Sequence, residues 1–181
     1  DHYGLTKIKR MIRDFMAARR RANNPKGKVL CFVGPRGVGK TTLASSIARA
    51  MGRPLASLSV NGLSDPAVLR GLPYTYLGSK PGGLIEQLRL AGVTNPVFLI
   101  DEADKMVANA AGQNPGADAL HNILDPDRNR VFRDEYLGVP YDLSDVFFIL
   151  TANDRSRIPE TLKGRLEIIE LTGYTTDEKM E

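Results

Sequence analysis

The chain has 181 residues, of which 42% are hydrophobic and 25% charged, and its formal net charge is +4. A chain of this size buries roughly 70% of its unfolded surface as one domain, and its one cysteine and two histidines exclude a disulfide-stapled mini-protein and a Cys/His zinc cluster. No apolar run approaches the roughly 18 to 20 residues that span a bilayer, and residues 1–10 lack the apolar core of a signal peptide, so we expect a soluble protein without a membrane partner.

The first predicted element is an amphipathic helix over residues 5–21, in which apolar side chains recur on one helical face. Its other face is basic, because residues 5–28 contain nine Lys and Arg but a single acidic residue, Asp14. Such a face suits either solvent or an anionic partner such as nucleic acid. We predict a solvated face, with weak nucleic-acid binding as the alternative, because no aromatic side chains interleave with the basic ones.

Five later segments have the composition of β-strands. Continuous apolar runs, typical of central parallel strands covered on both faces, occupy residues 29–33, 97–100 and 146–150. Runs interrupted by polar residues, which suit the edges of a sheet, occupy residues 55–60 and 166–171. Helical patterns lie between them at 39–51, 64–70, 82–91, 116–124 and 159–164. This alternation predicts a three-layer α/β fold with a five-stranded parallel sheet.

A glycine-rich motif joins the first predicted strand to the helix that follows it. Residues 34–41 read Gly-Pro-Arg-Gly-Val-Gly-Lys-Thr and match GxxxxGK[ST] in the strand-to-helix context that this motif requires. A bare turn would need one glycine but would not explain the Lys-Thr pair, so we predict a phosphate-binding loop whose N–H groups face the anion. Lys40 would reach the β- and γ-phosphates, and the Thr41 hydroxyl would bind Mg²⁺. The predicted nucleotide-binding residues of this segment are Gly34, Pro35, Gly37, Val38, Gly39, Lys40, Thr41 and Thr42.

Acidic and amide side chains follow the other two buried strands of the prediction. Asp101 and Glu102 come directly after residues 97–100, and Asn153 follows residues 146–150. Because parallel strands end at one edge of a sheet, we predict Asp101 beside Mg²⁺, Glu102 as the carboxylate that polarises water, and Asn153 as an amide that orients water or contacts the γ-phosphate. An acidic helix cap and a simple turn are the respective alternatives.

Arg165 stands between the predicted helix at 159–164 and the last predicted strand. From there it can project toward the phosphate of another subunit, as an arginine finger does. A structural salt bridge is equally compatible with the residues alone.

In this order the parts resemble an AAA+ ATPase, and longer matches resemble the ATPase module of the Lon family of ATP-dependent serine proteases. The resemblance is carried by DHYGL at 1–5, LCFVGP at 30–35, NPVFLIDE at 95–102, LDP at 124–126, VPYDLS at 139–144 and GY at 173–174. It implies the large α/β subdomain of an AAA+ P-loop module without its helical lid. Residues 1–28 would form the basic helix and adenine-side segment, 29–175 the P-loop core and 176–181 the start of a linker to the lid, so we expect a fragment of a longer protein.

The resemblance implies further roles at the nucleotide. His2 and Tyr3 would lie beside the adenine, Asn153 would be the first sensor residue, and Arg165 would be the finger that acts on a neighbouring subunit. The implied cofactors are ATP or ADP and Mg²⁺, and the implied activity is ATP hydrolysis. The Ser-Lys proteolytic domain of the family is not among these residues, so we assign no proteolytic role to this chain.

The resemblance also implies a role in moving protein substrates. Residues 75–78, Thr-Tyr-Leu-Gly, resemble the pore loop in which Tyr76 and Leu77 would grip an unfolded or damaged protein, and residues 113–116 fall where a second pore loop would be. Nearby glycines and prolines predict an exposed loop, with packing of Tyr76 on the core as the alternative. A homohexamer in the full-length protein, coupling ATP hydrolysis to unfolding and translocation, would work in bacterial cytoplasm or a mitochondrial matrix.

Three positions depart from the family pattern: Arg36 replaces a usual proline, residues 72–74 replace an Arg-rich stretch, and Gly164 replaces a usual aspartate. None is a predicted phosphate or magnesium ligand, so we expect the nucleotide chemistry to be retained. Two other function classes remain open. Another AAA+ remodelling ATPase, of the clamp-loader or helicase-loader type, would not explain Tyr76 and Leu77, and a DNA-binding module would need neither Glu102 nor Asn153.

Overall fold

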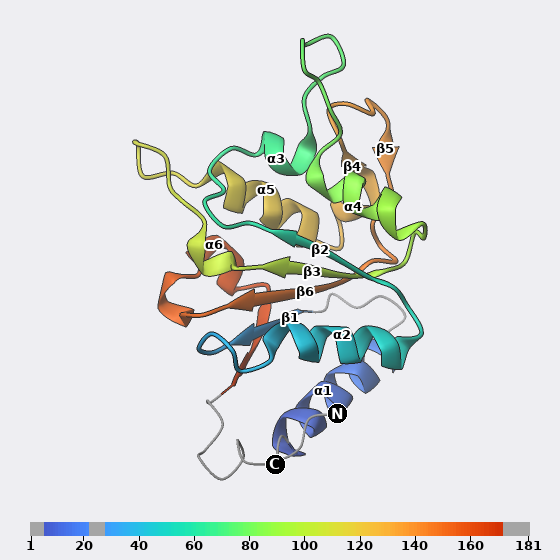
Figure 1. Ribbon diagram of the computed structural model, residues 1–181, viewed down its shortest axis with the longest axis vertical. Helices are drawn as coiled ribbons and strands as arrows, with labels where there is room; N and C mark the ends of the chain where they lie inside the picture. Colours follow the sequence, from blue (N-terminus) through green and yellow to red (C-terminus); the bar gives the residue numbers. More distant parts are fainter. Residues whose placement is uncertain (1–5, 22–27, 172–181) are drawn as a thin grey trace.

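A five-stranded parallel sheet forms the centre of the computed structural model, which describes residues 6–21 and 28–171 (Figure 1). The strands are β1 (Val29–Val33), β2 (Leu55–Ser59), β3 (Val97–Asp101), β6 (Phe147–Ala152) and β7 (Leu166–Glu170), in the spatial order β2-β3-β6-β1-β7. The three central strands are almost wholly buried, whereas β2 and β7 each combine buried, partly exposed and exposed residues. The predicted fold class and the predicted division into central and edge strands are therefore confirmed.

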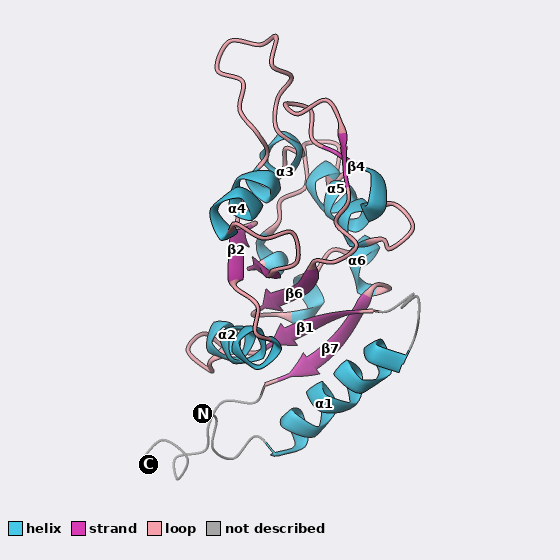
Figure 2. Ribbon diagram, turned by 90° about the vertical axis from the view of Figure 1, so that its right-hand side faces the viewer, coloured by secondary structure: helices cyan, strands magenta, loops and turns pink. Residues whose placement is uncertain are grey.

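Helices cover both faces of the sheet and produce three layers (Figure 2). One face carries α1 (Thr6–Arg21) and α2 (Lys40–Met51), and the other carries α3 (Ala67–Arg70), α4 (Gly83–Ala91), α5 (Pro115–Leu124) and α6 (Glu160–Lys163). Three single turns of 3-10 helix lie in the connections, at η1 (Ala103–Lys105), η2 (Asn129–Val131) and η3 (Arg155–Arg157). Each face has its own apolar core, because alternate side chains of a central strand point to opposite sides of the sheet.

The predicted N-terminal helix is present as α1, and its apolar face packs on the sheet. Ile12 is buried among side chains of the α2 layer, and the ring of Phe15 meets Phe147 of β6 edge-on, with the ring centroids 6.5 Å apart. Arg10 and Arg13 are exposed on the other face, as predicted. Among the described residues, no helix is long and apolar enough to cross a bilayer.

A small antiparallel hairpin was not predicted. It pairs β4 (Phe132–Arg133) with β5 (Pro140–Tyr141), and β4 lies beside α5 (Figure 2). A strand of two residues has no measurable hydrophobic period, so the sequence pattern carries no signal for it. The helix predicted over 64–70 is also shorter than expected: α3 is a single turn that begins after Pro66.

Candidate active site

The glycine-rich loop connects β1 to α2 at the carboxyl edge of the sheet. Gly37 and Gly39 have φ angles of 82° and 87°, a left-handed conformation that glycine adopts without steric cost. Gly39 is also the N-cap of α2, and no side chain accepts a hydrogen bond from the first turn of this helix. The first N–H groups of α2 are therefore available to an anion, which the positive end of the helix dipole also favours.

Lys40 closes over this loop and joins it to the end of β6. Its Nζ donates hydrogen bonds to the backbone oxygens of Gly34 (2.6 Å) and Pro35 (2.8 Å) and to Oδ1 of Asn153 (3.0 Å). Burial lowers the pKa of Lys40 from its usual range, and the nearby Asp101 carboxylate opposes that shift. The structure thus brings together Lys40, Asn153 and Asp101, which the sequence predicted separately.

Thr151 organises the two acidic residues, and sequence reasoning missed it. Its side chain is fully buried near the end of β6, and its hydroxyl donates a hydrogen bond to Oδ1 of Asp101. The same hydroxyl oxygen accepts a hydrogen bond from the backbone N–H of Glu102, with an N···O distance of 3.2 Å. A hydroxyl at the end of an otherwise apolar strand, two residues before Asn153, is the sequence signal that could have identified it.

Glu102 has an unusual backbone and two cationic neighbours. Its φ of 62° is positive, the single such value among the non-glycine residues that the structure describes, and conformations of this kind concentrate at functional sites. Its carboxylate forms an ion pair with Lys105 and lies 4.0 Å from the Arg36 guanidinium. The hydrogen bond from Lys105 is the main cause that holds the pKa of Glu102 below its usual range. Neither cation was predicted to contact Glu102.

Arg165 lies at the opposite edge of the sheet. It directly precedes β7, and its backbone oxygen accepts a hydrogen bond from the N–H of Val29, the first residue of β1 (2.7 Å). Its guanidinium, one-third exposed, pairs with Asp125, and its Nε lies 3.5 Å from Nε2 of His121. The structure therefore does not bring Arg165 to the Lys40 site of its own chain.

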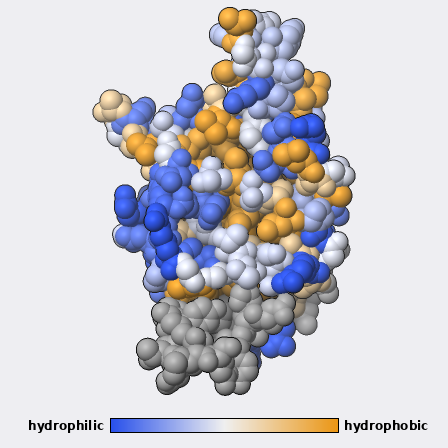
Figure 3. Space-filling model, viewed as in Figure 1, coloured by the Kyte–Doolittle hydropathy of each residue, from blue (hydrophilic) through white to orange (hydrophobic). Residues whose placement is uncertain are grey.

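The loop 72–81 projects away from the sheet between α3 and α4, with a hydrophobic residue at its tip (Figures 1 and 3). The side chains of Tyr74, Tyr76 and Leu77 are exposed, Leu77 completely. Local turns shape the loop: the N–H of Tyr76 donates to the Pro73 oxygen (3.0 Å) and that of Ser79 to the Tyr76 oxygen (3.1 Å). The predicted exposed loop is confirmed, and packing of Tyr76 on the core is excluded.

Two other groups of predicted residues lie elsewhere. His2 and Tyr3 fall outside the described part of the chain. Residues 113–116 cover the start of α5, where the Asn114 side chain caps the helix by accepting from the Ala117 N–H (3.0 Å). Gln113 is exposed at the end of the preceding loop, whereas Gly116 is buried against Leu63.

Comparison with known proteins agrees with this geometry. Residues 30–174 match the model of the family described as "ATPase family associated with various cellular activities (AAA)". The chain is 53% identical over its whole length to a Lon protease of Solibacter usitatus, 53% identical over 99% of its length to Lon protease 3 of Sorangium cellulosum, and 52% identical over its whole length to the peroxisomal Lon protease homolog 2 of Arabidopsis thaliana. It spans 22%, 21% and 20% of the length of these relatives, about a fifth of each.

Proposed function

Since the chain belongs to the AAA family of ATPases, we propose that it is the motor module of a Lon-like ATP-dependent protease, which couples ATP hydrolysis to unfolding and translocation of substrate proteins. The observation that carries this proposal is the meeting of Lys40, Asp101 and Asn153 beside an uncapped helix N-terminus. An anion site, a carboxylate and a polar amide at one sheet edge are the parts that phosphoryl transfer to water requires. We also propose that residues 1–28 form the basic helix and adenine-side segment, residues 29–175 the P-loop core, and residues 176–181 the start of a linker to the lid.

The glycine-rich loop can bind the phosphates of ATP through backbone N–H groups that no side chain caps and through the cation of Lys40. The first N–H groups of α2 would bind phosphate oxygens, and Lys40 would exchange the Gly34 and Pro35 oxygens for the β- and γ-phosphates. Thr41 and Thr42 are exposed in the first turn of α2 and can contribute their hydroxyls. We assign His2 and Tyr3 to the adenine side on family resemblance alone.

The oxygen donors beside the loop suit Mg²⁺. Thr41 supplies a hydroxyl and Asp101 a carboxylate, and Thr151 fixes the orientation of that carboxylate. Within the described residues no group of three or more His, Cys, Asp or Glu side chains could hold a metal alone, which suits an ion that keeps waters and takes ligands from phosphates. When bound, Mg²⁺ would neutralise charge on the phosphates.

Glu102 is the residue that we assign to proton removal. A carboxyl whose pKa lies below the usual Glu value is ionised near neutral pH, so Glu102 has a free electron pair that can accept a proton from the attacking water. Asn153, which contacts Lys40, would orient that water or sense the γ-phosphate.

Arg165 would complete the site of a neighbouring subunit. Because it lies at the amino edge of the sheet and the phosphate loop at the carboxyl edge, it can serve a nucleotide only across an interface. The Asp125 carboxylate would hold the guanidinium until it meets that phosphate. We therefore propose a homohexamer in the full-length protein, in which the six loops carrying Tyr76 and Leu77 grip unfolded or damaged proteins.

Nucleic-acid binding and the cellular compartment remain predictions from the sequence. Weak nucleic-acid binding by α1 would use exposed residues such as Arg10 and Arg13. The expected compartment is a bacterial cytoplasm or a mitochondrial matrix, whereas the printed names of some relatives place those proteins in the peroxisome. The clamp-loader and helicase-loader alternative is not favoured, because the compared proteins that match the whole chain are Lon proteases.

The test is Glu102→Gln in the full-length protein. The amide keeps the shape of the side chain but cannot accept a proton, so nucleotide binding should persist while ATP hydrolysis and ATP-dependent proteolysis fall by about 10² or more. Glu86→Gln, which removes a solvent-accessible carboxylate on α4, is the matched control and should behave as the wild type. Hydrolysis by the Glu102 variant at the wild-type rate would refute the assignment.

A further inference from the structure

The loop that carries Tyr76 and Leu77 stands on two crossing segments. The N–H of Leu72 donates to the Lys80 oxygen (3.2 Å), which closes the loop at its base. There the backbones of Gly71 and Gly82 touch: a Cβ on Gly82 would lie 2.1 Å from the Leu69 oxygen, and a Cβ on Gly71 would lie 2.7 Å from the Gly82 nitrogen. No side chain fits between these segments, so the base of the loop is compact although its tip is exposed.

A buried carboxylate ties this base to the β4–β5 hairpin. Oδ2 of Asp134 accepts a hydrogen bond from the Gly82 N–H (2.8 Å), and Oδ1 accepts from the N–H groups of Tyr136 (2.9 Å) and Leu137 (3.1 Å). One residue further, the Glu135 N–H donates to the Arg70 oxygen (2.7 Å) at the other side of the base. The hairpin therefore holds both segments, one through its backbone and one through the Asp134 side chain.

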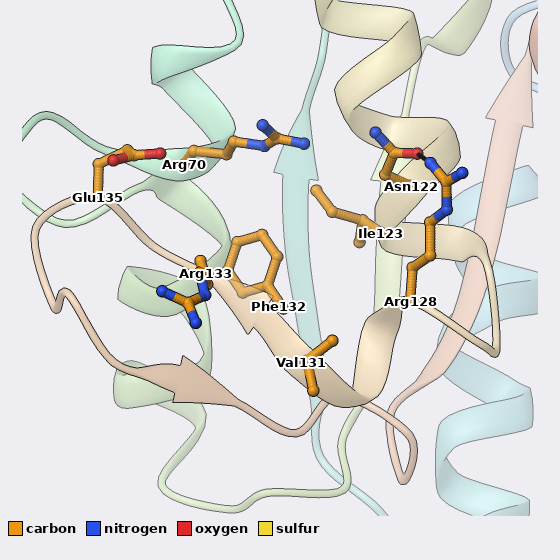
Figure 4. Close-up of a pocket in the computed structure, with 8 residues that line it drawn as sticks. All are labelled: Arg70, Asn122, Ile123, Arg128, Val131, Phe132, Arg133 and Glu135. Carbon is orange, nitrogen blue, oxygen red and sulfur yellow. Dashed lines mark hydrogen bonds between the residues drawn. The ribbon is translucent and has the colours of Figure 1, made fainter.

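Hydrogen bonds join the two segments at this junction. A hollow of about 320 Å³ lies directly beside it, with Arg70 from α3 and Glu135 from the hairpin at one end and Phe132 near its middle (Figure 4). The contact depends on the Asp134 carboxylate and on the backbone bond between residues 70 and 135.

Burying this carboxylate is costly, and turn formation does not require it. Asp134 is fully buried, and no cation pairs with it in the described part of the chain. A carboxylate removed from water without a cation costs several kcal/mol unless hydrogen bonds replace its hydration. An Asp in an ordinary surface turn has no such cost: Asp142, which directly follows β5, accepts from the Ser144 N–H (2.8 Å) while exposed. The turn alone therefore does not explain why Asp134 is buried, whereas its hydrogen bond to the Gly82 N–H does.

We propose that Asp134 is a positioning residue that fixes the base of the loop 72–81, so that force on Tyr76 and Leu77 passes through Gly82 into the hairpin and the core. This inference rests on the proposed function of that loop. Phe132, buried two residues before Asp134, connects the hairpin to the core on the α4 and α5 side of the sheet. Without Asp134 the tip of the loop 72–81 would still contact a substrate, but the base of the loop would move when the substrate pulls on the tip.

The first experiment compares Asp134→Asn with Asp142→Asn in the full-length protein. Both carboxylate oxygens of Asp134 accept from N–H groups, and an Asn side chain has one oxygen and one NH₂ group. In Asp134→Asn the NH₂ group would therefore face an N–H group and could not accept from it, so one side of the junction loses its hydrogen bond. We expect ATP hydrolysis within about twofold of the wild type, unchanged degradation of a permanently unfolded protein, and degradation of a stably folded protein slowed about tenfold, as loss of one charge-assisted hydrogen bond would give. Asp142→Asn should change none of the three.

The outcomes distinguish failure of this inference from failure of the proposed function. If Tyr76→Ala also leaves folded-protein degradation unchanged, the loop is not the gripping element and both proposals fail. If Tyr76→Ala abolishes that degradation but Asp134→Asn does not slow it, only the role of Asp134 is refuted. Parallel loss of ATP hydrolysis and both degradation rates in Asp134→Asn would show a general structural role and would also refute it.

Amide hydrogen exchange in the unmodified protein gives a test that does not depend on folding of a variant. We expect the Gly82 N–H to exchange at least about a hundredfold more slowly than the N–H groups of Leu77 and Gly78 at the tip, because its bond to Asp134 is buried. Equal exchange along residues 72–82 would mean that the base opens as freely as the tip, which contradicts the proposal.

Discussion

The carboxyl edge of the sheet and the loop 72–81 differ in how firmly their side chains are held. At the edge, Lys40, Asp101 and Asn153 follow buried strands or begin a long helix, and Thr151 and Lys105 fix their acidic neighbours. In the loop, Tyr76 and Leu77 are exposed and only local turns shape the tip. Chemistry at phosphates needs groups held to within a fraction of an ångström, whereas gripping many different polypeptides needs exposed apolar surface without a fixed partner. The two regions should therefore respond to mutation independently.

The largest effect should come from isolating the chain, so that no neighbouring subunit supplies Arg165 to the site at the carboxyl edge of the sheet. Arg165 cannot reach the phosphate loop of its own chain, so the isolated 181-residue chain should hydrolyse ATP about 10³ to 10⁵ times more slowly than the assembled protein. It should also show no peptidase activity. The measurement is ATPase rate against chain concentration, and fast turnover that does not depend on concentration would contradict the account.

A second prediction tests the support of Asp101. Thr151→Val keeps the volume of the side chain but removes the hydroxyl that bonds Asp101 and Glu102, so ATP hydrolysis should fall about 10- to 100-fold, as loss of an outer-shell partner of a metal ligand does. Activity at high Mg²⁺ concentration should recover in part. Thr161→Val, an exposed site on α6, is the control. Unchanged activity of the Thr151 variant would show that Asp101 needs no support.

A smaller and pH-dependent effect is expected at Lys105. The hydrogen bond from Lys105 lowers the pKa of Glu102, so Lys105→Gln should raise that pKa toward its usual value. Since Glu102 must be ionised to accept a proton, the variant should lose ATPase activity as pH falls toward the usual Glu value of 4.5, where the wild-type carboxylate stays ionised, and approach the wild type as pH rises. Lys163→Gln, which removes an i,i+3 pair with Glu160 on α6, is the matched control. An acid limb that does not move would exclude Lys105 from this role.

The smallest effect on the chemistry should follow from changes to the basic helix. Reversing charge at the exposed residues Arg10 and Arg13 should leave ATP hydrolysis within about twofold of the wild type, because surface charges on α1 lie outside the site. If weak nucleic-acid binding occurs, a salt series should show it decreasing as salt rises, and the double variant should lose it. A large ATPase defect would connect α1 to the chemistry.

The same contrast explains what the sequence could predict. The central strands and the glycine-rich loop carry strong local signals, so the sequence predicts β1, β3, β6 and the strand-to-helix turn at residues 34–41 in their correct places. Thr151 and Asp134 act through bonds to residues 49 to 52 positions away. A hydroxyl at the end of an apolar strand marks Thr151 as a candidate, but no local pattern tells which distant residues Thr151 or Asp134 contacts. Lys105 pairs with Glu102 three residues away, and Glu102 has a positive φ that the sequence does not reveal.

The most direct test of the account measures two rates on the full-length Tyr76→Ala variant: ATP hydrolysis and degradation of a stably folded protein. Tyr76 is exposed in the loop 72–81, which projects away from the sheet (Figure 1), so ATP hydrolysis and the melting temperature should stay close to the wild type while degradation of the folded protein is largely lost. A melting temperature lowered by several degrees, as loss of a buried aromatic worth about 3 to 5 kcal/mol would produce, would contradict the account. Unchanged degradation would contradict it equally.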